Sequence, residues 1–122
     1  MELIDRSARR AHACAARVPA SDNPGVQLGA IIGTCATSGS DKLTLISSGG
    51  IRAIGAWLEQ LLAESTGKNG KGVVPVDREP LGIPDASGAD RLFVYLRRAS
   101  DDAAAQDAQV RAIERSGPPV WR

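Results

Sequence analysis

Aromatic side chains are scarce in this chain of 122 residues: two Trp, one Tyr and one Phe make up 3% of it. A hydrophobic core must therefore be built from Ala, Leu, Ile and Val. The formal net charge is only +1, and the sequence has no basic stripe with interleaved aromatic residues. That stripe is the usual footprint of nucleic-acid binding, so we expect no nucleic-acid partner.

Cysteine and histidine are almost as rare. Cys14 and Cys35 match no metal-binding spacing, so we expect free, buried thiols and no metal. His12, the single histidine, has no partner for nucleophilic catalysis, and a surface position is expected for it. No apolar run reaches the roughly 18 residues of a membrane helix, and the start is charged from its second residue, unlike a secretory signal. We therefore expect a protein of the reducing cytoplasm.

Helical and strand patterns alternate along the chain. Such alternation predicts parallel strands joined by right-handed helical crossovers. The fold class that we predict is α/β, a partial three-layer α-β-α sandwich with a mostly parallel sheet. Residues 1–22 form a helical lead-in, and residues 23–122 form the incomplete α/β domain. The predicted helices cover residues 2–17, 24–39, 51–66 and 101–115, and the predicted strands cover 42–47, 73–76, 91–96 and a last strand that begins at 120.

The helix predicted over residues 51–66 carries the most informative polar residues. Glu64 falls in its last turn, and Gln60 lies one turn earlier on the same face. Lys68 and Lys71 follow directly. A placed acid beside a cationic loop suits proton transfer on an anionic substrate. The alternative is a solvated surface glutamate followed by a polar turn, and spacing alone leaves both interpretations open.

Two other features have a functional and a structural interpretation. The turn from Ser47 to Gly50 leads from a strand into a helix, where backbone N–H groups can hold a phosphate. We favour the simpler prediction that Ser48 is an N-cap. Trp57 is expected to be a packing residue rather than a platform for a substrate.

Five segments in order resemble glucose-6-phosphate isomerases, and among these the isomerase half of bacterial bifunctional transaldolase–phosphoglucose isomerases. The run EQLLAESTGKNGKG is the specific part of the resemblance. The matching segments are NPGVQLGAIIG (23–33), DKLTLISS (41–48), WLEQLLAESTGKNGKGVVPV (57–76), EPLG (79–82) and DRLFVYLR (90–97).

The resemblance implies that residues 23–122 are part of a second sugar-isomerase (SIS) domain. It also implies interconversion of glucose 6-phosphate and fructose 6-phosphate, in glycolysis and gluconeogenesis, without metal or organic cofactor. Glu64 stands where the family has the base that moves a proton between C1 and C2 through an enediol. Gln60 stands at a position that lines the sugar-phosphate site. Thr66 replaces the asparagine of the commoner isomerases.

The family's phosphate loop, its enediolate-binding arginine, its ring-opening histidine and a late lysine have no counterpart here. His12 precedes Glu64 and cannot be that histidine. The resemblance therefore implies a segment that is inactive alone and is completed by the remaining isomerase segments or by a second chain; a homodimer is one such assembly. The alternative is a non-catalytic fragment that binds sugar phosphate or has a structural role. No membrane partner is expected.

Overall fold

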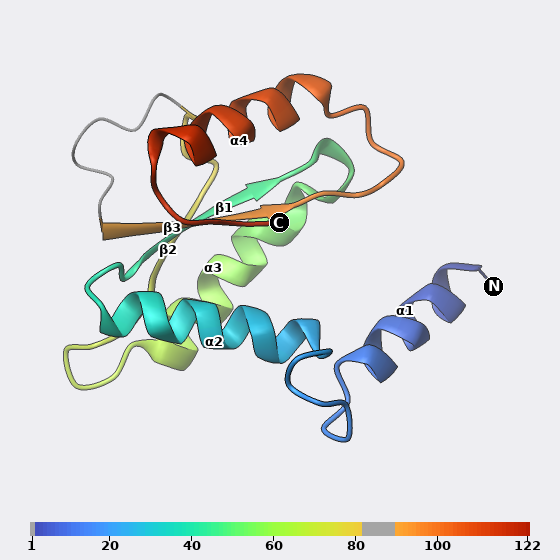
Figure 1. Cartoon of the computed structure of the whole chain (residues 1–122), viewed down its shortest axis with the longest axis horizontal. Coiled ribbons are helices and arrows are strands. Elements are labelled where there is room, and N and C mark those ends of the chain that lie inside the picture. Colours follow the sequence, from blue (N-terminus) through green and yellow to red (C-terminus); the bar gives the residue numbers. More distant parts are fainter. Residues whose placement is uncertain (1, 82–89) are drawn as a thin grey trace. The chain divides into compact units, whose positions relative to one another are not determined.

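The computed structural model describes residues 2–81 and 90–122 (Figure 1). The chain packs into two compact units, Met1–Thr34 and Cys35–Arg122. The division lies inside a helix and later than the domain boundary that we expected at residue 22. Within the described residues, no helix is long and apolar enough to cross a membrane.

The first unit holds helix α1 (Glu2–Ala13) and most of helix α2 (Pro24–Thr37). Asn23 caps α2, because its side-chain oxygen accepts hydrogen bonds from the backbone N–H groups of Gly25 and Val26, both at 3.1 Å. Pro24 occupies the first helical position, where its missing N–H costs nothing. The start predicted for α2 is confirmed. α1 ends four residues earlier than the predicted residue 17, because the chain there enters short turns such as Ala15 N to His12 O.

Within residues 35–81 and 90–122, the second unit is built on a four-stranded sheet in which every pair is parallel, in the order β2-β1-β3-β4. β1 pairs with β3 along its whole length, from Lys42 opposite Arg91 to Ser47 opposite Leu96. This confirms the predicted fold class. The strands are β1 (Lys42–Ser47), β2 (Val74–Asp77), β3 (Arg91–Leu96) and β4 (Val120–Trp121).

Two helices cover the sheet. After β1 comes the 3-10 helix η1 (Gly49–Ile51), and helix α3 (Ala53–Thr66) then leads to β2; helix α4 (Ala104–Ser116) connects β3 to β4. These two crossovers run in opposite directions from the central pair of strands. Because parallel crossovers are right-handed, the two helices fall on opposite faces of the sheet, as Figure 1 shows for α3 and α4.

The core follows the alternation of side chains along the central strands. On the α4 face, Ile46 and Phe93 pack with Val110 and Ile113 of α4. The opposite face buries Leu43, Leu45, Leu92 and Val94. Pro75 lies in β2, an outer strand of the described sheet, where a proline is tolerated.

Gly55 allows α3 to approach β2 closely. A Cβ atom at this position would overlap the Asp77 carboxylate, so any larger residue requires that side chain to move. Gly55 is also the one described residue of α3 that is fully buried. The apolar side chains of this helix are only partly covered: Ile54 and Leu61 remain 39% and 44% exposed.

Replacing Ile113 by alanine tests the core on the α4 face. Ile113 is 3% exposed, and its loss leaves a cavity against Phe93 and Val110. We expect Ile113→Ala to lower the free energy of unfolding by about 2–5 kcal/mol, measured by urea denaturation. The control Ile4→Ala, at a position 73% exposed, should change it by less than about 0.5 kcal/mol. Equal effects of both variants would contradict the described core.

Candidate functional site

The carboxyl ends of β1 and β3 lie side by side because these strands pair in register to their last residues. Between them the strand order reverses, and open parallel sheets bind ligands at such a reversal. The loop after β1 begins at Ser48, and the loop after β3 contains Arg98 and Asp101. This edge of the sheet is therefore the first place to look for a site.

The Asp101 carboxylate joins these two loops. One oxygen accepts hydrogen bonds from the Ser48 hydroxyl at 2.6 Å and from the Gly50 backbone N–H at 2.8 Å. The other accepts a charge-assisted hydrogen bond from Arg98 Nε at 2.7 Å. These donors favour the ionised form, chiefly through Ser48, and lower the pKa of Asp101 to about 2.

The turn from Ser47 to Gly50 therefore has neither of the two roles considered for it. The Ser48 side chain makes no capping hydrogen bond, which corrects the predicted N-cap. Its hydroxyl donates to Asp101 and accepts from the Arg98 backbone N–H at 3.0 Å. A phosphate could not bind all the backbone N–H groups of this turn either, because the Gly50 N–H already donates its hydrogen bond to the Asp101 carboxylate.

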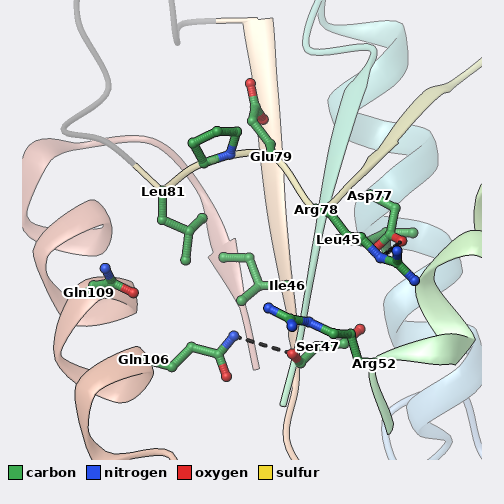
Figure 2. A pocket seen from close by; sticks show the side chains of 11 residues that line it. Leu45, Ile46, Ser47, Arg52, Asp77, Arg78, Glu79, Leu81, Gln106 and Gln109 are labelled. Atoms are coloured by element: carbon green, nitrogen blue, oxygen red, sulfur yellow. Dashed lines mark hydrogen bonds and ion pairs between the residues drawn. The ribbon is translucent and has the colours of Figure 1, made fainter. Parts of the chain in front are cut away.

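Beside this clamp lies a cavity of about 290 Å³ (Figure 2). Gln106 of α4 crosses to β1 and donates a hydrogen bond to the Ser47 carbonyl at 3.2 Å. In Figure 2 the Arg52 side chain extends over the end of β1 toward Gln106. The lining is completed by Leu45, Ile46, Asp77, Arg78, Glu79, Pro80, Leu81 and Gln109.

The two acidic residues of the cavity wall already have partners. Asp77 lies 3.3 Å from Arg78 Nε. Glu79 forms an ion pair with Arg91 and accepts a hydrogen bond from the Thr44 hydroxyl at 2.8 Å. Arg52, in contrast, has no side-chain partner among the described residues. Among the charged side chains that line the cavity, Arg52 is therefore the one without an ion-pair partner in the described part of the chain.

Glu64 and Gln60 lie elsewhere. Both are exposed on α3, and neither lines the cavity. Glu64 is in the last turn of the helix, whereas Arg52 immediately precedes its first residue. Arg52 and Glu64 are 12 positions apart in the sequence. At a rise of 1.5 Å per residue, their backbone positions are about 18 Å apart along the helix. The Glu64 side chain has no hydrogen-bond or ion-pair partner within residues 2–81 and 90–122.

The turn after Glu64 is held by its own backbone and by Thr66. Lys68 and Lys71 pair in an antiparallel bridge, and between them Asn69 and Gly70 take positive φ angles of 55° and 72°. This is the conformation that an Asn-Gly turn favours. The Thr66 hydroxyl donates to the Leu62 carbonyl at 2.7 Å and accepts from the Val73 N–H at 3.0 Å. The motif thus forms a defined turn between α3 and β2.

Other sequence predictions have mixed outcomes. His12 is exposed, as expected. The cysteines are free, but Cys14 is exposed and Cys35 only half-buried, so the prediction of buried thiols is wrong. Trp57 is 60% exposed and is not a packing residue within this structure.

Within the described residues, no three His, Cys, Asp or Glu side chains form a metal site. Gly82 of the EPLG segment lies outside the described residues.

Sequence reasoning missed Asp101, Arg52 and the glutamines of α4. A usable signal was present, because polar residues just beyond the carboxyl ends of neighbouring parallel strands gather at one edge of the sheet. Asp101 was instead assigned to the start of a helix. α4 begins only at Ala104, since the Asp101 carboxylate is bound to the other loop.

Comparisons with protein-family models, with curated proteins and with solved structures find no significant match to this chain. The isomerase resemblance therefore depends on the residues of this sequence alone.

The Asp101 clamp predicts a specific dependence of stability on pH. Its pKa is about 2 in the folded chain against 3.8 for an ordinary aspartate, so its contribution is complete above about pH 4 and is lost as the pH falls toward 2. We expect Asp101→Asn to lower the melting temperature at pH 7. The difference in melting temperature between this variant and the unsubstituted chain should shrink toward pH 2, as measured by circular dichroism. A difference that stays constant over this range would contradict the clamp.

Replacing Thr66 tests the turn after Glu64. Thr66→Val removes the acceptor of the Val73 N–H, and we expect a loss of about 1 kcal/mol in the free energy of unfolding. Thr66→Ser keeps the hydroxyl and should restore most of that loss. Faster amide exchange at Val73 in the valine variant alone would identify the broken hydrogen bond. If both variants exchange at the rate of the unsubstituted chain, the assigned role of Thr66 is incorrect.

Proposed function

We propose that this chain supplies the proton-transferring segment of an aldose–ketose isomerase that interconverts glucose 6-phosphate and fructose 6-phosphate. The observation that carries the proposal is the state of Glu64. It is exposed in the last turn of α3, without a partner among the described residues, and is followed by an ordered turn with two lysines. A carboxylate in this position is free to accept a proton from a bound molecule.

The reaction requires one base to move a proton between adjacent carbons. In the proposal, Glu64 takes the proton from C2 of the open-chain aldose and returns it to C1 of the enediol. Gln60 lies one helical turn earlier on the same exposed helix and orients the sugar phosphate. Lys68 and Lys71 are exposed and add positive charge beside the substrate's phosphate.

Most of the acceleration in such reactions comes from positioning and from electrostatic stabilisation of the developing charge. The resemblance assigns the phosphate loop, the enediolate-binding arginine, the ring-opening histidine and a late lysine to other parts of the enzyme. We therefore propose that this chain alone has little or no turnover. It becomes active with the remaining isomerase segments or with a second chain, without metal or organic cofactor. The free state of both cysteines supports a reducing, cytoplasmic location.

The alternative function is a non-catalytic SIS fragment that depends on a partner chain. Ile54, Trp57 and Leu61 favour it, because they lie on one face of α3 and all three are more than a third exposed. Val74 on the outer strand β2 is also exposed, at 51%. Apolar surface of this kind suits a protein interface.

The isomerase proposal is tested by complementation. The chain is mixed with a bifunctional isomerase that lacks the segment matching residues 57–76, and conversion of fructose 6-phosphate is followed by a coupled dehydrogenase assay. We expect activity with the unsubstituted chain and at least a hundredfold less with Glu64→Gln, the scale of general-base catalysis. The exposed glutamate of α4 provides the control Glu114→Gln, which should leave the rate unchanged.

Full activity of the Glu64→Gln mixture would exclude Glu64 as the base. A mixture that forms a stable complex but has no activity, even with the unsubstituted chain, would favour the non-catalytic alternative.

A further inference from the structure

The cavity beside the Asp101 clamp has no role in the proposed isomerase. It lies at the carboxyl ends of β1 and β2, between the turn that leaves β2 and helix α4. It is about 18 Å along α3 from Glu64. Neither Glu64 nor Gln60 lines the cavity, so a ligand held there is separate from the one proposed for Glu64.

The available charge in this cavity is positive. Both carboxylates of the wall, Asp77 and Glu79, are engaged by Arg78 and Arg91. Arg52 alone has no side-chain partner among the described residues, and its guanidinium extends toward the middle of the lining residues in Figure 2. A guanidinium presents several N–H donors in a planar fork that fits phosphate or carboxylate oxygens.

Polar groups without partners accompany this arginine. Gln109 of α4 lines the cavity and has no hydrogen-bond partner among the described residues. The Ser47 hydroxyl, at the end of β1, is buried and likewise has no partner in the described part of the chain. Buried polar atoms are normally satisfied, so the Ser47 hydroxyl is an unsatisfied polar atom in a residue of the cavity lining.

The cavity's size and position restrict the ligand. A volume of about 290 Å³ is at the lower limit of small-molecule sites, which suits a compact metabolite. The neighbouring Gly50 N–H is occupied by Asp101, so Arg52 is the cation that remains available to an incoming anion. Gln106 is already fixed by its hydrogen bond to the Ser47 carbonyl and provides a preformed wall.

We propose that this cavity is a binding site for small organic anions that carry a phosphate or carboxylate group. Arg52 is the cation that binds the anionic group, and the side-chain amide of Gln109 donates a hydrogen bond to it. The site is independent of Glu64 and does not require the isomerase reaction.

The test is a titration of the full ¹⁵N-labelled chain, followed by amide chemical shifts. The probes are inorganic phosphate, fructose 6-phosphate, malonate and, as an uncharged comparison, fructose. We expect saturable shifts at Arg52, Arg78 and Gln109 with at least one of the three anions and none with fructose. The ratio of affinities for fructose 6-phosphate and malonate identifies which anionic group the site prefers.

Three variants separate a built site from general attraction of anions. Arg52→Gln should weaken binding at least tenfold, and Gln109→Glu should weaken it through repulsion. Arg115→Gln removes the same charge from an exposed position in the last turn of α4, outside the cavity, and should leave the affinity unchanged. Circular dichroism confirms that each variant is folded.

Absence of saturable shifts with every anion would overturn the proposal. Equal weakening by Arg52→Gln and Arg115→Gln would overturn it as well. The Glu64→Gln variant should bind the anions normally, so failure of the isomerase proposal and failure of this one are distinguishable.

Discussion

Asp101 holds the carboxyl edge of the sheet together by accepting hydrogen bonds from Ser48, Gly50 and Arg98. These donors come from the loops that leave the two central strands, so the carboxylate joins two segments that are about fifty residues apart in the sequence. The position of Arg52 follows from this clamp, because Gly50 lies in the 3-10 helix η1, which ends at Ile51 directly before Arg52. The start of α4 follows as well, since Asp101 is kept out of the helix.

The clamp also determines where an external anion can bind. A strand-to-helix turn with two glycines is a ready place for a phosphate. Here that place is filled by a carboxylate of the chain itself, and the free cation stands beside it at Arg52. Glu64 lies at the other end of the same helix. The proposed anion-binding cavity thus lies before the first turn of α3. The proposed base, Glu64, is exposed in the last turn of the same helix.

The local patterns of the sequence predicted the sheet well. KLTLIS and RLFVYL are β1 and β3 with the predicted bounds. The predictions failed where a side chain has a distant partner. Ser48 is a residue type that favours N-caps, but its hydroxyl donates a hydrogen bond to Asp101. Asp101 is a residue type that is common at helix starts, but its carboxylate accepts a hydrogen bond from the Gly50 N–H. Helix propensity contains no information about a loop that folds back from another strand. The cavity was missed for the same reason, since the fold alone brings Arg52 and Gln109 into one lining.

The most direct test of the Asp101 clamp is to follow the chemical shift of the Gly50 amide proton in a nuclear magnetic resonance titration from pH 6 to pH 1.5. If Asp101 accepts its hydrogen bond, the Gly50 resonance should move with the same midpoint as the Asp101 carboxyl carbon, near pH 2. A Gly50 resonance that does not move, together with an Asp101 carboxyl that titrates at its ordinary value of 3.8, would show that the clamp is absent.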